Sequence, residues 1–201
     1  MNIIRIPCGP LNANSYIVYN DKNNAIVIDV GGYKEIEEVL QRENITLKAI
    51  LLTHGHFDHC SGVKYFQEKG VKVYINESDD EQVKKALFAS SFKIDYRPFN
   101  ADYYLQEGIN LIEGININVI FTPGHSRGGV TFIIENNMFT GDTLFHRNIG
   151  RTDLFGGNAD DMKDSLIKLF AFDGDYVVYP GHNESTSLSL EREFFKRWLK
   201  L

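Results

Sequence analysis

The stretch Thr53-His54-Gly55-His56-Phe57-Asp58-His59 decides the fold of this 201-residue chain. Three of its residues are histidines and one is an aspartate, so four side chains that can bind a metal fall within six residues. The apolar run 49–52 comes directly before the stretch, which is the pattern of a buried strand that ends in a turn. Imidazole and carboxylate together suit zinc, and they also accept iron or manganese.

Three further candidate ligands lie in short glycine-containing turns, each after an apolar run. They are His125, Asp142 and His182. With the first four they make seven nitrogen and oxygen donors, which is what two divalent cations and a bridging water need. This pattern indicates a hydrolase.

The spacing predicts how the seven ligands divide between two ions. In a turn that leaves a strand, side chains two residues apart can point to one side, and the next pair reaches a neighbouring point. The first ion is therefore expected to take three histidines, namely His54, His56 and His125. The second ion is expected to take Asp58, His59 and His182. Asp142 is the expected bridge, because one carboxylate has two oxygens to share.

Composition limits the class of protein. The net charge is −6 and there is no long basic run, which argues against a nucleic-acid partner, because phosphate contacts supply most of the affinity of such proteins. No stretch reaches the roughly 20 apolar residues of a membrane span. Residues 1–7 lack the basic and apolar regions of a secretory signal, so we expect a cytoplasmic protein.

The apolar pattern predicts a mixed α and β chain. Strands are predicted at 2–6, 15–19, 25–29, 49–52, 71–75, from 103 onward at 109–112, 115–121, 130–134 and 138–140, and at 176–179. Helices are predicted at 33–43, 61–69, 159–170 and 185–200, with one more that Ser78 caps. Residues 90–101 have no clear period and are predicted to form a loop. This layout favours one domain, 1–201, in which two mixed sheets pack together with helices on their outer faces.

The seven ligand candidates resemble, in order and spacing, those of the metallo-β-lactamase superfamily. The resemblance extends over nearly the whole chain and implies an α+β fold, a four-layer αββα sandwich with the site along one edge of its sheets. Zinc β-lactamases of the main class carry a cysteine ligand in the region of Asp142. The resemblance therefore argues against a β-lactamase.

Two segments are more specific. Gly141-Asp142-Thr143-Leu144-Phe145 and Gly150-Arg151-Thr152-Asp153-Leu154 are similar to the glyoxalase II-like branch, the hydroxyacylglutathione hydrolases. This implies hydrolysis of a small thioester at two metal ions, zinc first and iron or manganese as alternatives. A bridging hydroxide would attack the acyl carbonyl, and Asp58 would orient it as the catalytic residue.

The same resemblance suggests roles for residues outside the ligand set. Arg151 is a candidate contact for an anionic substrate, with a salt bridge to Asp153 as the alternative. Asp29 is expected to orient a ligand imidazole, and Asn14 and Tyr16 are expected to line the cleft. Only 19 residues follow His182, so we expect neither a counterpart of the helical domain of full-length glyoxalase II nor the pocket that it encloses, and we expect a more open pocket. Three residues receive no role: His146, Cys8 and Cys60.

Other chemistries on the same fold remain open. A mononuclear iron persulfide dioxygenase carries a related Gly-Arg-Thr-Asp segment, and its iron would take the counterparts of His54, His125 and Asp142. A lactonase and an RNA-processing phosphodiesterase are less favoured. The phosphodiesterase would require a basic surface and an RNA-gripping arm, neither of which the sequence shows.

Overall fold

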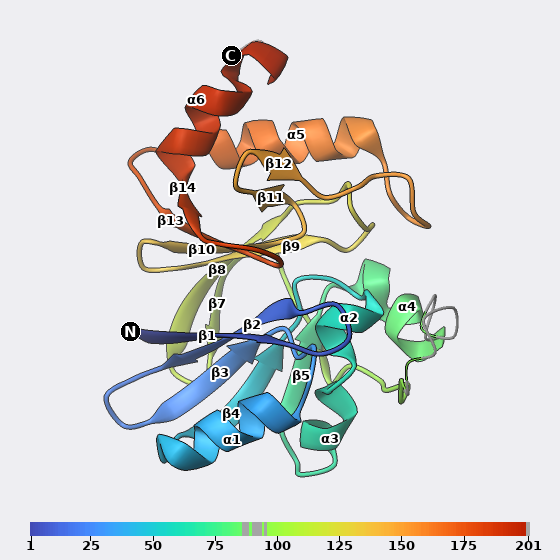
Figure 1. Cartoon of the computed structure of the whole chain (residues 1–201), viewed down its shortest axis with the longest axis vertical. Coiled ribbons are helices and arrows are strands. Elements are labelled where there is room, and N and C mark those ends of the chain that lie inside the picture. Colours follow the sequence, from blue (N-terminus) through green and yellow to red (C-terminus); the bar gives the residue numbers. More distant parts are fainter. Residues whose placement is uncertain (86–88, 90–93, 95, 200–201) are drawn as a thin grey trace.

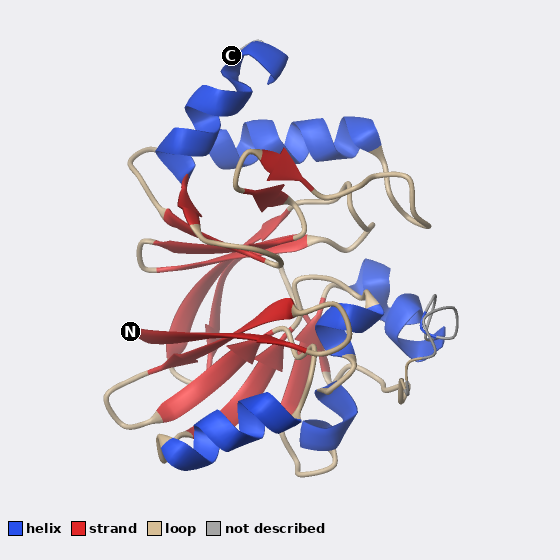
Figure 2. Ribbon diagram, viewed as in Figure 1, coloured by secondary structure: helices blue, strands red, loops and turns tan. Residues whose placement is uncertain are grey.

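A computed structural model describes residues 1–85, 89, 94 and 96–199 of the chain, and it contains two six-stranded sheets. The sheets pack face to face, with helices on both outer faces (Figures 1 and 2). The predicted αββα sandwich is thereby confirmed. The predicted loop 90–101 lies partly outside the described residues.

The first sheet is mixed, with strand order β1-β2-β3-β4-β5-β6. Strands β1 to β3 are antiparallel, whereas β3 to β6 run parallel to one another. The bounds are β1 Asn2–Cys8, β2 Ala13–Tyr19, β3 Asn24–Ile28, β4 Thr46–Leu51, β5 Lys72–Ile75 and β6 Tyr103–Tyr104. Because parallel neighbours end at the same edge, the carboxyl ends of β3 and β4 deliver Asp29 and the histidine stretch side by side.

The second sheet is also mixed, with strand order β14-β13-β10-β9-β8-β7 and one parallel pair, β10 and β13. The bounds are β7 Gly108–Ile112, β8 Ile115–Phe121, β9 Val130–Ile134, β10 Asn137–Gly141, β13 Val177–Pro180 and β14 Thr186–Ser187. A small hairpin of β11 (Leu144–Phe145) and β12 (Asn148–Ile149) follows β10. Asp142 and His182 come directly after the parallel pair.

Three apolar clusters correspond to the three spaces between the four layers. In β4, Ala49 and Leu51 face the second sheet, whereas Ile50 and the residue just after the strand, Leu52, face the helices α1 (Lys34–Arg42) and α3 (Val63–Gln67). A strand buried on both faces needs this continuous apolar run. The third cluster joins the second sheet to α5 (Ala159–Phe170) and α6 (Leu188–Leu199).

Three local details differ from the sequence prediction. In place of the helix predicted at 61–69 there are two short helices. The first, α2 (Phe57–Cys60), begins inside the histidine stretch, and Gly62 packs tightly against Val30 before α3 starts. Asn76, not Ser78, caps the next turn, since its side chain accepts a hydrogen bond from the backbone N–H of Ser78. That turn is the 3₁₀ helix η1 (Glu77–Asp79), which leads into α4 (Asp80–Lys85).

The C-terminal segment also begins differently, because β14 takes the first part of the predicted helix and α6 starts at Leu188. Across the residues that the structure describes, none of the helices combines the length and apolar character needed to span a membrane.

Candidate metal centre

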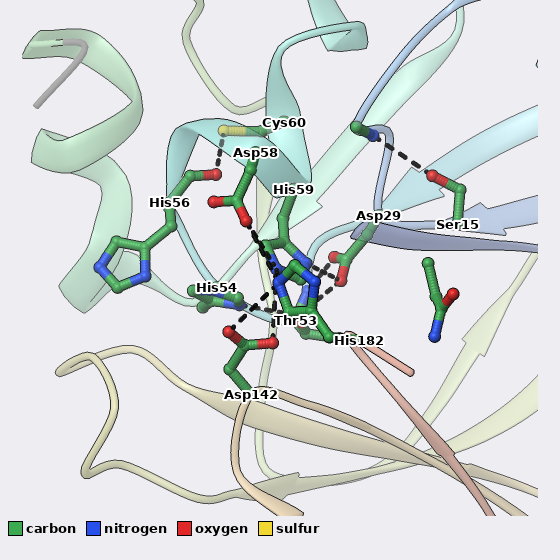
Figure 3. Close-up of polar contacts among 12 residues, drawn as sticks. Ser15, Asp29, Thr53, His54, His56, Asp58, His59, Cys60, Asp142 and His182 are labelled. Carbon is green, nitrogen blue, oxygen red and sulfur yellow. Dashed lines mark hydrogen bonds and ion pairs between the residues drawn. The ribbon is translucent and has the colours of Figure 1, made fainter. Parts of the chain in front are cut away.

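The seven predicted ligands converge at one edge of the sandwich, where loops from both sheets meet. Figure 3 labels all of them except His125. The first sheet supplies the histidine stretch after β4. The second sheet supplies the other three ligands: His125 after β8, Asp142 after β10 and His182 after β13. Long-range packing of the two sheets thus assembles the site.

The first group consists of His54, His56 and His125, whose candidate ligand atoms lie within 4.8 Å of one another. The Nδ1 of His125 lies 2.8 Å from the carbonyl of Arg151 and donates to it, which leaves Nε2 without a proton. That Nε2 is 2.8 Å from Nδ1 of His56. The Nε2 atom of His54 is buried, and none of the residues that the structure describes gives it a hydrogen bond.

The second group consists of Asp58, His59 and His182, whose candidate ligand atoms also lie within 4.8 Å of one another. Nε2 of His182 is 3.2 Å from Oδ2 of Asp58 and 3.3 Å from Nε2 of His59. Nε2 of His59 is 3.6 Å from the same Asp58 oxygen. Three donor atoms therefore face one point.

Asp142 lies between the two groups. Its Oδ1 is 3.4 Å from Nε2 of His59, and its Oδ2 is 3.4 Å from Nε2 of His125 and 3.7 Å from Nε2 of His182. In the view of Figure 3, Asp58 and Asp142 approach the rings of His59 and His182 from opposite sides. Oδ1 of Asp142 is buried and has no hydrogen-bond partner among the described residues. Buried polar atoms left without partners are costly in a folded protein, so these atoms fit metal ligands.

Asp29 orients ligands on both sides of the site. Its Oδ1 accepts the backbone N–H of Thr53 at 2.8 Å, and its Oδ2 accepts the Thr53 hydroxyl at 2.7 Å. Nδ1 of His59 lies 2.8 Å from Oδ2, and Nδ1 of His54 lies 2.9 Å from the Thr53 hydroxyl oxygen. A carboxylate can only accept, so Nδ1 of His59 keeps a proton, and Nε2 is the nitrogen that a metal ion would bind in place of a proton.

The electrostatics of the two groups differ. Burial, together with repulsion from His125, lowers the pKa of His56 to about 4, so its imidazole is neutral at pH 7. Burial would lower the pKa of His59 as well, but Asp142, Asp58 and Asp29 raise it to about 10. The centre therefore combines neutral imidazoles with a point that strongly favours positive charge, and both conditions suit cations.

The turn that carries His182 is held by two residues of β2. The Nδ2 group of Asn14 donates to the carbonyls of Pro180 and Asn183, each at 2.9 Å, and the hydroxyl of Tyr16 donates to Pro180 at 2.7 Å. We expected Asn14 and Tyr16 to line the cleft. Both are buried instead, and they position a ligand-bearing turn.

Gly181 is required in this turn. A Cβ there would lie 2.2 Å from Oδ1 of Asp142 and 2.7 Å from the ring of His59. Only glycine lets the backbone pass this close to the centre.

The centre opens into a pocket with an apolar wall. Leu11, Phe57 and Leu154 line it together with Arg151 and ligand side chains. The guanidinium of Arg151 is exposed and makes two hydrogen bonds of 2.7 Å to the carboxylate of Asp153, which is the alternative considered above. The carbonyl of the same arginine orients His125, a role that the sequence did not suggest.

The remaining sequence candidates lie outside the ligand set. The Cys60 sulfur is 2.9 Å from the carbonyl of His56, and burial raises the pKa of this thiol. Cys8 is buried against Ser15, and His146 is exposed between β11 and β12.

Comparison with known proteins places the chain in a family. Residues 8–182 match the model of the metallo-beta-lactamase superfamily, and the chain belongs to that superfamily. It is 32% identical over 204 residues to the hydroxyacylglutathione hydrolase GloC of Haemophilus influenzae, covering 96% of this chain and 95% of the relative. Membership of this superfamily, together with the similarity to metallo-hydrolases within it, supports a metal-dependent hydrolase.

Two solved structures have closely similar folds. One is described as the BLEG-1 B3 metallo-beta-lactamase, with a TM-score of 0.88, 33% identity and coverage of 96% of this chain and 97% of that one. The other is TTHA1623 in a di-iron-bound form, with a TM-score of 0.87, 31% identity and coverage of 95% and 98%. A similar chain has thus been solved with two metal ions, and another bears a β-lactamase name.

Proposed function

We propose that this protein hydrolyses small acyl thioesters at a centre that binds two divalent metal ions, with zinc as the first candidate. The observation that carries the proposal is the position of Asp142, whose two oxygens face His59 on one side and His125 on the other. A carboxylate shared between two ligand groups suits a centre that holds two metal ions close together. The likeness to a hydroxyacylglutathione hydrolase supports thioesters as the substrate class.

The seven side chains would divide as the two groups do, with Asp142 shared. When bound, two divalent ions would lower the pKa of coordinated water toward about 7 and polarise the acyl carbonyl. The first group adjoins the pocket through His56 and His125, so an ion held there would polarise the carbonyl oxygen.

Asp58 orients the attacking water in this proposal. Its carboxylate lines the pocket and is 3.2 Å from His182, so it can accept a proton from water at the centre. Burial would raise the pKa of Asp58, but the neighbouring His59 and His182 lower it overall, which keeps the carboxylate ionised and able to orient water through hydrogen bonds.

The pocket wall suits a small acyl group. Leu11, Phe57 and Leu154 would contact its apolar part and exclude water from the reacting carbonyl. A thiolate is a good leaving group, so the reaction does not require a strong general acid. Arg151 lines the pocket and would contact a carboxylate of the thiol carrier once its ion pair with Asp153 opens.

A substrate panel tests this proposal. Purified protein loaded with zinc is assayed with S-lactoylglutathione, a neutral acyl thioester, an acyl lactone and a chromogenic cephalosporin, and a persulfide is assayed for oxygen uptake. We expect thioester cleavage to have the highest kcat/KM. Preferred cleavage of the cephalosporin or lactone, or oxygen consumption with iron-loaded protein, would overturn the thioester assignment.

A further inference from the structure

We propose that Asp79 is a positioning residue that holds the first ligand group, His54, His56 and His125, in register for its metal ion. The proposal rests on the metal centre proposed above and deepens it. Asp79 is the last residue of η1, and its side chain is fully buried. It belongs to neither ligand group, and the histidine motif does not include it.

The carboxylate of Asp79 connects the two loops that carry the first group. Its Oδ2 accepts the backbone N–H of Gly55 at 2.9 Å, and its Oδ1 accepts the backbone N–H of Gly128 at 2.7 Å. A third donor, Nε2 of Gln82, reaches Oδ1 at 2.9 Å. One buried carboxylate therefore satisfies backbone donors from both sheets, and hydrogen bonds to an ionisable carboxylate are among the stronger ones in proteins.

Both glycines come close to Asp79 because they lack a Cβ atom. A Cβ on Gly128 would lie 2.7 Å from Cγ of Asp79, and a Cβ on Gly55 would lie 2.9 Å from the Asp79 carbonyl oxygen. Any larger residue at either position would push its loop away. The sequence thus keeps two glycines where the two loops approach Asp79.

The backbone N–H groups that contact the Asp79 carboxylate belong to the loops that carry the first ligand group, so Asp79 should affect the binding of one ion and not of both. Gly55 separates His54 from His56, and Gly128 is three residues after His125. The distance of 2.8 Å between Nδ1 of His56 and Nε2 of His125 depends on how the two loops are held together. Asp29, by contrast, reaches His59 in the second group as well as Thr53.

Replacement of Asp79 should therefore weaken binding of the ion held by the first group and leave binding of the other ion unchanged. In Asp79→Asn the shape is kept, but the amide NH₂ faces a backbone N–H that loses its acceptor. We expect one of the two ions to bind about 10- to 100-fold more weakly, the range found for residues that orient metal ligands, and the other to bind as in the wild type.

Cobalt(II) titration of metal-free full-length protein measures both ions, through visible absorption and elemental analysis. His125→Ala and His182→Ala supply reference spectra for loss of the first and second group. Asp79→Asn should resemble His125→Ala. Asp80→Asn is the matched control, because it removes a neighbouring carboxylate that contacts Lys84 and Tyr104, and both of its ions should bind normally.

Gln82→Met provides a milder variant if Asp79→Asn does not fold. It removes one of the three donors, and it should weaken the same ion by a smaller factor. Unchanged binding of both ions in the folded variants, or equal weakening of both, would overturn the proposal. The readout is metal binding, so protein that binds cobalt normally but cleaves no thioester would count against the proposed function and leave this inference intact.

Discussion

The histidines of this centre depend on the hydrogen bond that each ring makes away from the centre as well as on the nitrogen that faces it. The proton of His59 is fixed by Asp29, and that of His125 is fixed by the carbonyl of Arg151. Each contact turns the opposite ring nitrogen toward the centre. The ligand set is therefore preorganised, which reduces the ordering that metal binding requires.

Asp142 is the residue with the largest expected effect. In Asp142→Ala both groups lose a shared oxygen ligand, so we expect metal affinity to fall by at least about 100-fold, the upper end for residues one step farther from a metal. Thioester turnover should fall with it. Elemental analysis and kcat check both, with His146→Ala as the control for an exposed histidine. Two retained ions with normal turnover would contradict the bridging role.

Arg151 and Asp153 together are expected to set the preference for charged substrates. Their pair is exposed, and exposed ion pairs contribute little to stability, so Asp153→Asn should fold normally and free the guanidinium. We expect its KM for an anionic glutathione thioester to fall several-fold, and that of Arg151→Ala to rise. A neutral thioester is the control, and equal changes for both substrates would show that the pair has only a structural role.

At the scale of elements, ligand-bearing turns are held by neighbouring strands. Strand β2 holds the turn after β13 through the buried hydroxyl of Tyr16, which donates to Pro180. Tyr16→Phe should lower the free energy of unfolding by about 1 kcal/mol, the usual loss for one buried hydrogen bond. Urea unfolding measures this, with exposed Tyr103→Phe as the control. Equal stability of the two variants would exclude the hydroxyl from holding the turn.

The sequence predicted some of the elements and missed others. The long strands and the ligand turns were predictable, because apolar runs and closely spaced histidines are local signals. The early start of α2 and the hairpin β11–β12 were not predicted, and the cap was assigned to Ser78, although Asn76 makes it through a local contact with Ser78. The role of Asp79 was not predictable, since Gly55 and Gly128 approach it only after the sheets pack.

Within the whole molecule, the two-sheet sandwich holds two halves of one site. The histidine stretch comes from the first sheet and the other three ligands from the second, so the apolar cluster between the sheets fixes their relative positions. An ion bound by both halves should stabilise the fold as a whole, because it binds only the assembled state.

Metal removal should therefore lower the melting temperature. At a free metal concentration about 1,000 times the Kd, binding stabilises a protein by about 4 kcal/mol. For a chain of this size that corresponds to a fall in Tm of about 8–16 °C on chelation. Calorimetry with and without a chelator measures the shift, and re-addition of zinc should reverse it. An unchanged Tm would mean that no ion links the two sheets.

The central claim is that two ions act together on a thioester. Its most direct test is a titration of metal-free protein with zinc, in which cleavage of S-lactoylglutathione is followed at each addition. We predict that full activity requires about two equivalents per chain, as for other two-metal hydrolases. Full activity at about one equivalent, or cleavage by the metal-free protein, would contradict the account.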